Sequence, residues 1–214
     1  IRRVRARVLP FFCVLYIIAY IDRANVAFAK LSMTADLKFS EEVFGLGAGI
    51  FFIGYLVLEI PGALIMERWG ARIWIARILV TWGVVTVLLG FIQTAKEFYL
   101  LRLLLGFAEA GFFPGLIVYL SRWFPWKERA RAMGAFILAV PVSFVISAPL
   151  SALFLNLDWF GLEGWRWMFI LEGIPAIVAG FVTFRYVTDH PKDAHWMPEN
   201  EREWLISQLK AEKE

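Results

Sequence analysis

The most regular feature of the chain is a series of six long apolar runs separated by short polar segments. The runs cover residues 8–29, 43–66, 73–93, 98–120, 131–156 and 167–187. About 20 helical residues are needed to cross a bilayer core about 30 Å thick, and each run is that long. The runs are far longer than the alternating segments of about ten residues that form membrane β-barrels. The first run is also too long for a cleaved signal peptide. The pattern predicts an all-α membrane protein with six transmembrane helices.

The composition supports this class. Hydrophobic residues make up 60% of the 214 residues and charged residues 19%, whereas soluble domains are about 45–50% apolar and about 25% charged. The net charge of +3 could suggest nucleic acid, but the basic residues are scattered between apolar runs instead of forming one basic face. The single cysteine, Cys13, cannot form an intrachain disulfide.

The basic residues gather in alternate loops, and this asymmetry predicts the orientation. Cytoplasmic loops carry an excess of Lys and Arg, so both ends of the chain are expected in the cytoplasm, with the protein in the cell inner membrane. Fifteen lie on the predicted cytoplasmic side: Arg2, Arg3, Arg5, Arg7, Arg68, Arg72, Arg122, Lys127, Arg129, Arg131, Arg185, Lys192, Arg202, Lys210 and Lys213. Four lie opposite: Lys30, Lys38, Lys96 and Arg166.

The runs suggest a two-part organisation. Residues 1–187 are expected to form the six-helix transmembrane bundle, and residues 188–214 the start of a cytoplasmic central loop with an amphipathic helix. We interpret this helix as a solvated or interfacial linker in preference to a partner-binding helix. The chain begins without Met and ends in this charged helix, so we expect a piece of a longer protein. Three helices followed by three also suggest an inverted repeat.

The first run carries an acid and a base deep in the predicted membrane. Ionisable side chains in hydrocarbon are costly, so Asp22 and Arg23 are functional candidates. Neighbours on a helix point about 100° apart, and these two side chains therefore face different directions. Tyr16, Tyr20 and Arg23 share one face, which suits a water-filled path. The alternative is that both charges are neutralised by neighbouring helices and only fix the packing.

The fourth run carries Arg102 and Glu109, two turns or about 10 Å apart along the helix. This is too far for an easy ion pair, so each is expected to need another partner. Burial opposes the charge of Glu109 and a nearby Arg favours it, and such a balanced carboxyl can load and release a proton. Arg102 could instead extend to the outer surface. Glu172 is expected at the outer interface, and Tyr55 could supply a hydroxyl or only pack.

Small residues and prolines indicate close contacts and bends. Gly45 with Gly49 in the second run, and Gly111 with Gly115 in the fourth, have the GxxxG spacing that allows helices to approach closely. Kinks are expected in the fourth and fifth helices, at Pro114, Pro141 and Pro149.

Enzymatic motifs are missing from the sequence. His190 and His195 lie beyond the last run, and no HExxH, GxSxG or P-loop pattern occurs. We therefore expect neither an enzyme nor a cofactor, a metal or a nucleic-acid partner.

Five segments carry a resemblance to a known family. They are YIDRANVAFA at 20–29, ERWGARIWIARILVTWG at 67–83, RLLLGFAEAGFFPG at 102–115, SRWFPWKERARAMG at 121–134 and GWRWMFILEGIPA at 164–176. Together they resemble the N-terminal half of a major facilitator superfamily transporter and, within it, the anion:cation symporter family. The resemblance implies one half of a twelve-helix fold with a 3+3 repeat. It also implies secondary active transport, in which a small organic anion such as tartrate, a sugar acid, phthalate or hydroxyphenylacetate enters with protons by alternating access.

The resemblance also assigns roles by position. Asp22 and Glu109 would be the proton-coupling acids, and Arg23, Arg102, Tyr20 and Tyr55 would bind the substrate. Gating is assigned to the loops, at Glu67, Arg68, Gly70, Arg72, Arg129 and Arg131. The partners implied are the anion, protons, the lipid bilayer and a C-terminal six-helix half.

The sequence also departs from the family pattern. The loop between helices 2 and 3 has Ala63 at the usual Gly, Glu67 at the usual Asp and Ala71 at a usual basic position. The fifth helix lacks the GxxxGP pattern of drug/proton antiporters, which makes efflux less expected. Two alternatives remain open. One is a permease for a neutral or different solute with structural Arg residues, and the other is a membrane receptor or scaffold that moves nothing.

Overall fold

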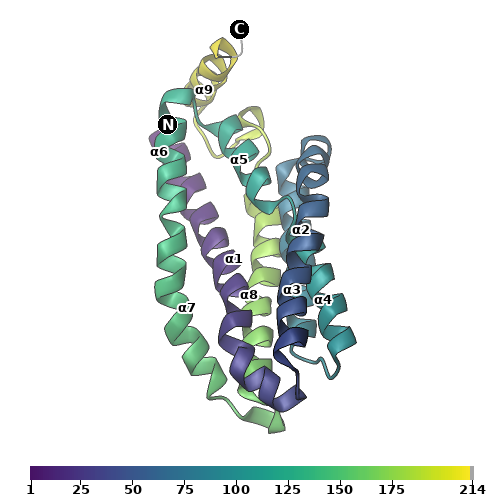
Figure 1. Cartoon of the computed structure of the whole chain (residues 1–214). Helices are drawn as coiled ribbons and strands as arrows, with labels where there is room; N and C mark the ends of the chain where they lie inside the picture. Colours follow the sequence, from purple (N-terminus) through teal and green to yellow (C-terminus); the bar gives the residue numbers. More distant parts are fainter. Residues whose placement is uncertain (213–214) are drawn as a thin grey trace.

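The chain forms an elongated bundle of helices that run alongside one another (Figure 1). The computed structural model describes residues 1–212, apart from the side chain of Ala63; Lys213 and the last residue of the predicted tail helix lie outside the described residues. The helices are α1 Arg2–Leu37, α2 Glu41–Trp69, α3 Ala71–Leu89, α4 Ala95–Glu109, α5 Phe112–Trp123, α6 Trp126–Ile137, α7 Ala139–Leu155, α8 Gly164–Tyr186 and α9 Glu199–Ala211, with short 3-10 turns at Trp159–Gly161 and Pro191–Asp193.

Six helical segments are long and apolar enough to cross a membrane, which confirms the predicted all-α class and the number of spans. The structural helices extend beyond several of the predicted runs, and α1 begins at Arg2 and ends at Leu37. A helix satisfies its backbone hydrogen bonds internally, so it can continue past the apolar stretch into polar surroundings.

Two of the six spans are interrupted, near Pro114 and Pro141, whereas Pro149 lies inside the uninterrupted α7 helix. The fourth span is α4 followed by α5, with Gly111 at a φ of 82° between them. The fifth is α6 followed by α7. A proline ring clashes with the carbonyl four residues earlier, and Pro114 and Pro141 stand four residues after Ala110 and Ile137, where α4 and α6 end.

The helix packing follows the pattern that a three-plus-three repeat requires. In such a repeat the first three spans (α1, α2 and α3) correspond in order to the last three (α4–α5, α6–α7 and α8). A contact of α2 with α4 must then be matched by a contact of α7 with α1. Both pairs pack closely, and so do the matched pairs α3 with α4 and α8 with α1. The third and sixth spans, α3 and α8, form a pair that maps onto itself, and their contact is the most extensive. The bundle therefore has the pairing expected of an internal repeat.

Close approach of α2 to α4 depends on glycines that differ partly from those predicted. A Cβ added at Gly54 would meet the Leu103 backbone oxygen at 2.5 Å, and one at Gly106 would clash with the Phe51 backbone. By contrast, no described atom lies within 4 Å of a Cβ built at Gly45 or Gly49, so the predicted contact there is wrong. Both glycines lie on an exposed face of α2.

The Gly111 and Gly115 spacing does mark a contact. Gly111 lies against Gly62, and a Cβ on Gly115 would be 2.9 Å from the Met66 sulfur. The α5 segment therefore packs against the second half of α2.

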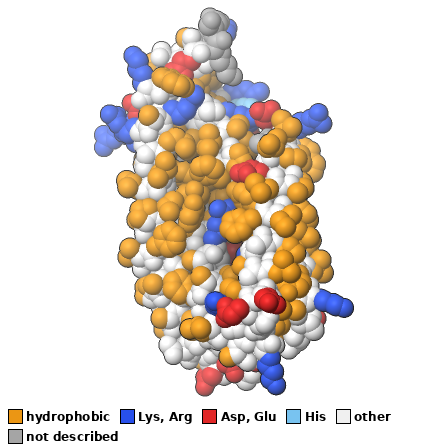
Figure 2. Space-filling model, viewed as in Figure 1, with side chains coloured by type: hydrophobic (Ala, Val, Ile, Leu, Met, Phe, Trp, Pro, Cys, Tyr) orange, Lys and Arg blue, Asp and Glu red, His pale blue; other side chains and the backbone are white. Residues whose placement is uncertain are grey.

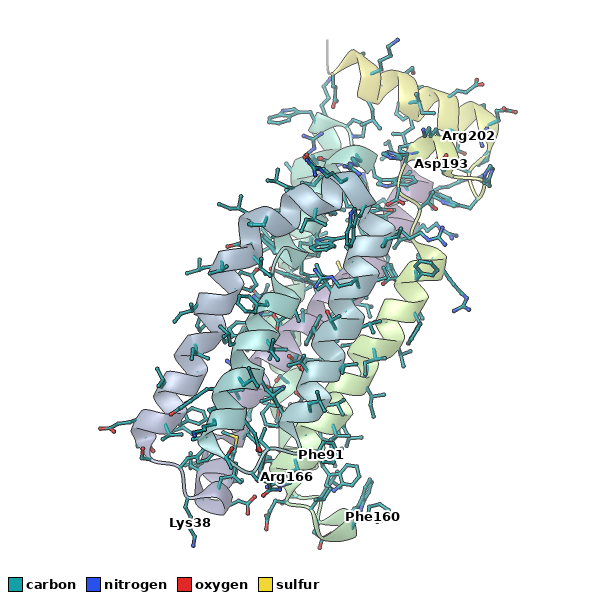
Figure 3. All side chains as sticks on the ribbon, turned by 90° about the vertical axis from the view of Figure 1, so that its right-hand side faces the viewer. Lys38, Phe91, Phe160, Arg166, Asp193 and Arg202 are labelled. Atoms are coloured by element: carbon teal, nitrogen blue, oxygen red, sulfur yellow. The ribbon has the colours of Figure 1, made fainter. Side chains whose placement is uncertain are left out.

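The two ends of the bundle differ. Both termini lie at one end, here called the terminal end, together with α9 (Figure 1). Figure 3 places Asp193 and Arg202 at this end, and Lys38, Phe91, Phe160 and Arg166 at the other, the opposite end. In α9, Leu205 is buried and Trp204 is about half exposed.

Candidate functional site

A buried ion pair joins the first and fourth spans. The Arg23 Nε donates to Glu109 Oε2 at 2.8 Å. The Glu109 side chain is 2% exposed and the Arg23 side chain 30% exposed. Glu109 ends α4 just before the break at Gly111, and its second oxygen, Oε1, has no hydrogen-bond partner within residues 1–212. The pair is thus accessible from the arginine side alone.

Tyrosines surround the exposed side of this pair. The Arg23 guanidinium lies 5.0 Å from the Tyr55 ring centre and 5.7 Å from the Tyr20 ring centre. The Tyr16 hydroxyl donates to the Tyr20 hydroxyl at 3.4 Å, so the predicted face of Tyr16, Tyr20 and Arg23 is present. Rings around a guanidinium stabilise its charge through their π faces.

One face of the bundle shows polar groups recessed between apolar surfaces. In Figure 2 basic and acidic side chains are visible at mid-height, flanked by hydrophobic side chains on both sides. Hydrocarbon would not tolerate an exposed charge at this depth. The Arg23 side chain is 30% exposed, so it requires polar surroundings in the membrane.

Asp22 faces the other way, as the helix geometry predicts. Its Oδ2 accepts from the Trp82 indole nitrogen at 2.8 Å and from the Thr86 hydroxyl at 3.3 Å. The Asn25 amide donates to its Oδ1 at 3.3 Å. Asp22 is 1% exposed, and these three donors are all neutral. It therefore lies in a dry interface between α1 and α3.

Arg102 is buried and does not extend to the outer surface, which excludes the snorkelling alternative. It is 7% exposed, and it donates to the backbone oxygens of Gly47 at 3.2 Å and Ala48 at 3.4 Å. Its guanidinium lies 4.7 Å from the Phe51 ring centre. Arg102 thus ties α4 to α2.

Glu172 contradicts its predicted place at the interface. It is 5% exposed, and neither carboxylate oxygen has a hydrogen-bond partner among the described residues. The reason is that α8 packs against α1, α3 and α7, so that depth along the helix does not mean access to water. Sequence reasoning missed this buried acid, although GWRWMFILEG places it eight residues inside the helix.

The loop between α2 and α3 is held against the end of α8. Gly70 has a φ of 85°, which favours glycine. The backbone N–H of Arg72 donates to Asp189 Oδ1 at 2.8 Å, and its side-chain Nε donates to the Phe184 oxygen at 2.6 Å. Arg72 thereby satisfies a carbonyl in the last turn of α8. No motif in the sequence indicated a role for Asp189.

The other predicted gating residues lie apart from that contact. Arg129 donates to the carbonyl oxygens at the end of α5, those of Ser121 and Phe124. Arg131 makes a loose ion pair of 3.7 Å with Glu128, which also pairs with Arg5. Glu67 and Arg68 are exposed. Only Arg72 and Gly70 of this set contact α8 or its following loop in the described structure.

A second buried arginine, Arg166, lies at the opposite end of the bundle and was not predicted as a site residue. Arg166 forms an ion pair with Asp36 at 3.2 Å and donates to the Gly90 and Ile92 oxygens. The Trp165 indole donates to the same Asp36 oxygen. These contacts join the ends of α1, α3 and α8.

Known proteins resemble this chain along its whole length. A candidate tartrate transporter of Agrobacterium vitis is 49% identical over 213 residues, covering 99% of this chain and 49% of that protein. A quinolone resistance transporter of Acinetobacter baumannii is 43% identical over 210 residues, covering 98% and 48%. NicT, a candidate metabolite transport protein of Pseudomonas putida, is 44% identical over 208 residues, covering 96% and 48%. The chain thus spans about half the length of the curated relatives it matches.

Solved structures share the fold. A bacterial homologue of the human lysosomal transporter Spinster, in an inward-facing and unoccupied conformation, has a TM-score of 0.81 at 22% identity, with 88% of this chain and 44% of that one covered. A D-xylose–proton symporter has a TM-score of 0.75 at 15% identity, with 97% and 53% covered. The family model described as Major Facilitator Superfamily matches residues 12–210. The chain is a multi-pass membrane protein that belongs to the Major Facilitator Superfamily of transporters.

Proposed function

We propose that the whole protein takes up a small organic anion, a carboxylate, together with protons by alternating access. The observation that carries this proposal is the Arg23–Glu109 pair in the middle of the bundle, with the arginine alone partly exposed. In this proposal the terminal end is cytoplasmic, the membrane is the cell inner membrane, and the other half of the transport path belongs to a further six-helix half.

Arg23 is the proposed anion-binding residue. A guanidinium is a planar fork that matches a carboxylate with two parallel hydrogen bonds. Glu109 engages the Nε of Arg23, so the outer nitrogens can receive a substrate carboxylate. Tyr20 and Tyr55 border that position and can supply hydroxyl contacts. Arg102 serves the site indirectly, because its guanidinium is held by α2 carbonyls.

Proton coupling follows from competition for Arg23. While Glu109 is ionised it neutralises Arg23, and an arriving carboxylate meets a compensated charge. Protonation of Glu109 frees the guanidinium, so proton binding favours anion binding and, by linkage, anion binding favours proton binding. Asp22 is the second proposed proton carrier, since burial among neutral donors makes its charge sensitive to rearrangement of α1 and α3.

Gating is proposed for the terminal end. The Arg72 and Asp189 contacts fasten the loop after α2 to the end of α8, and exposed Glu67, Arg68 and Arg131 are available for contacts with the other half. Arg129 would keep the end of α5 in place.

Uptake by the full-length protein in proteoliposomes under an imposed pH gradient tests this function. The panel contains tartrate, a sugar acid, phthalate, an aromatic acetate, a neutral sugar and a fluoroquinolone. We expect proton-driven accumulation of at least one carboxylate. Glu109→Gln should abolish that accumulation while counterflow exchange continues, because a permanently neutral side chain leaves the anion site open but cannot release a proton. Glu42→Gln, at an exposed position, is the matched control.

The same assay decides between the alternatives. Full proton-driven accumulation by Glu109→Gln would reject the role of that carboxyl. Transport of the neutral sugar alone would identify a permease with structural arginines, and binding without flux would identify a receptor. Because one relative is named for quinolone resistance, drug efflux is the specific alternative to carboxylate uptake. Movement of the fluoroquinolone in the direction opposite to proton entry would establish efflux.

A further inference from the structure

The loop between α7 and α8 places a phenylalanine in an unfavourable position. Phe160 is the most exposed large hydrophobic residue among the described residues, at 92%. Its φ is 56° and its ψ 22°, a left-handed conformation that glycine and asparagine adopt readily and bulky residues rarely adopt. A ring this exposed gains nothing from the core of the bundle. In water, both the backbone and the side chain of Phe160 would therefore be unfavourable.

Lys38, at the same end of the bundle, is the natural comparison (Figure 3). Lys38 and Phe160 are the two non-glycine residues with a positive φ in the described structure, and the φ of Lys38 is 54°. Lys38 is also exposed, just after the last residue of α1. Its charged side chain suits water. Two loops thus use one backbone conformation to present opposite chemistry, and water accounts only for the lysine.

Phe160 belongs to an ordered group of three aromatic rings, here called the aromatic cluster: Trp159, Phe160 and Trp167. The Trp167 indole nitrogen donates to the Trp159 backbone oxygen at 3.0 Å, which ties the loop to α8. The Trp167 ring centre lies 5.7 Å from that of Trp159 and 6.1 Å from that of Phe160. Trp159 is itself 53% exposed. The loop therefore holds an apolar surface in a fixed shape.

The aromatic cluster continues an apolar surface that runs along α8. From Trp167 to Phe184, every exposed residue of this helix is apolar: Ile174, Pro175, Val178, Phe181, Val182 and Phe184. The other sides of α8 pack against α1, α3 and α7. An exposed apolar stripe of this length on a membrane-spanning helix suits contact with lipid chains. The aromatic cluster stands where that stripe reaches the end of the span.

Charged residues beside the aromatic cluster indicate its depth. The loop joins the end of α7 at Leu155 to the start of α8 at Gly164, and the exposed acids Asp158 and Glu163 lie within it. These acids would be costly in hydrocarbon. Tryptophan favours the boundary between membrane and water, because its ring is apolar and its N–H is polar. The chemistry of the loop thus fits the headgroup level of a bilayer.

We propose that the aromatic cluster is a lipid-binding surface that inserts Trp159, Phe160 and Trp167 into the interfacial layer of the bilayer at the opposite end. The partner is a phospholipid surface. Transfer of the Phe160 ring from water to lipid offsets the cost of its backbone conformation. The loop thereby anchors the start of α8, where Arg166 pairs with Asp36 at the end of α1. This role goes beyond the proposed function and holds whatever solute is carried.

Spin labels in the full-length protein measure the depth of the loop. A nitroxide is attached at Phe160→Cys, or at Lys38→Cys as the matched control, with the native cysteines replaced and the protein in phosphatidylcholine vesicles. Oxygen concentrates in lipid, whereas a nickel chelate stays in water. The ratio of oxygen to nickel accessibility should be roughly threefold higher at position 160 than at position 38. Equal ratios would place the Phe160 loop in water and overturn the proposal. A label at position 160 that neither reagent reaches would overturn it too, because protein would then cover the aromatic cluster.

Tryptophan emission supplies a second readout that keeps the Phe160 ring in place. Brominated phosphatidylcholine quenches indoles that touch lipid, so Trp167→Phe should lower the quenched share of the emission. Trp165→Phe is the matched control on the same turn of α8. Trp165 is 0% exposed, so its loss should raise that share. Trp159→Phe repeats the test without removing the Trp167 hydrogen bond. An unchanged quenched share in both Trp167→Phe and Trp159→Phe would overturn the proposal.

Discussion

Asp22 and Arg23 are consecutive residues of one helix and occupy opposite environments. Asp22 points into the packed interface with α3, where indole, hydroxyl and amide groups donate to it. Arg23 is 30% exposed and pairs with Glu109 of α4. Neighbouring side chains on a helix point about 100° apart, and this rotation places Asp22 in the buried interior and leaves Arg23 partly exposed.

The difference indicates how the two sites can communicate. Since both side chains belong to one turn of α1, a shift that relaxes the Asp22 donors also moves the guanidinium. A carboxyl buried among neutral donors responds to protonation, whereas a partly exposed guanidinium responds to an anion. In the proposed transport cycle, the α1 helix would be the element through which protonation of Asp22 on one face biases anion binding at Arg23 on the other.

The largest effect is expected for removal of the accessible charge. Arg23→Gln should weaken binding of the transported carboxylate about 100-fold, equivalent to about 2.8 kcal/mol, because a charged hydrogen-bond partner of the anion is lost. The measurement is isothermal titration of the full-length protein. Arg77→Gln is the matched control, since the Arg77 guanidinium lies against the Trp74 ring on α3. Equal losses in the two variants would mean that general charge, and not Arg23 as a contact, attracts the anion.

The next effect concerns how closely α2 approaches α4. Gly106→Ala should lower the stability of the purified full-length protein by about 2 kcal/mol, because the added Cβ clashes with the Phe51 backbone, which cannot move as a side chain can. Gly45→Ala adds the same methyl on α2, where no described atom lies within 4 Å, and should be nearly neutral. Thermal unfolding in matched lipid gives both values. A stable Gly106→Ala variant would show that the two helices separate freely.

Sequence reasoning predicted the elements and their faces better than their partners. Periodicity located all six spans, and helix geometry correctly separated Asp22 from Arg23. It also concluded that Arg102 and Glu109 each need another partner. Sequence reasoning could not name those partners. Arg23 and Glu109 are 86 residues apart in the chain, and their pairing depends on how α1 and α4 are positioned along the axis of the bundle.

Glu172 and Gly45 show that sequence reasoning also could not tell which residues other helices cover. The distance of Glu172 from the helix start indicates depth, but burial is decided by the three helices packed around α8. The GxxxG spacing of Gly45 and Gly49 describes one helix face and says nothing of whether another helix covers it, and in the described structure none does.

The smallest expected effect belongs to the dry face. Trp82→Phe removes the shorter of the two α3 donors to Asp22, which stabilises the ionised carboxylate. A hydrogen bond to a charged group contributes about 1.5–3 kcal/mol, but Thr86 and Asn25 remain as donors, so the pH of half-maximal uptake should rise by about one pH unit at most. Trp74→Phe is the control on the same helix, because the Trp74 indole nitrogen has no partner within residues 1–212. Carboxylate affinity at a fixed acid pH should stay the same in both variants. A change in carboxylate affinity in Trp82→Phe would show that Trp82 acts directly on the anion, and that the two faces of α1 form one site.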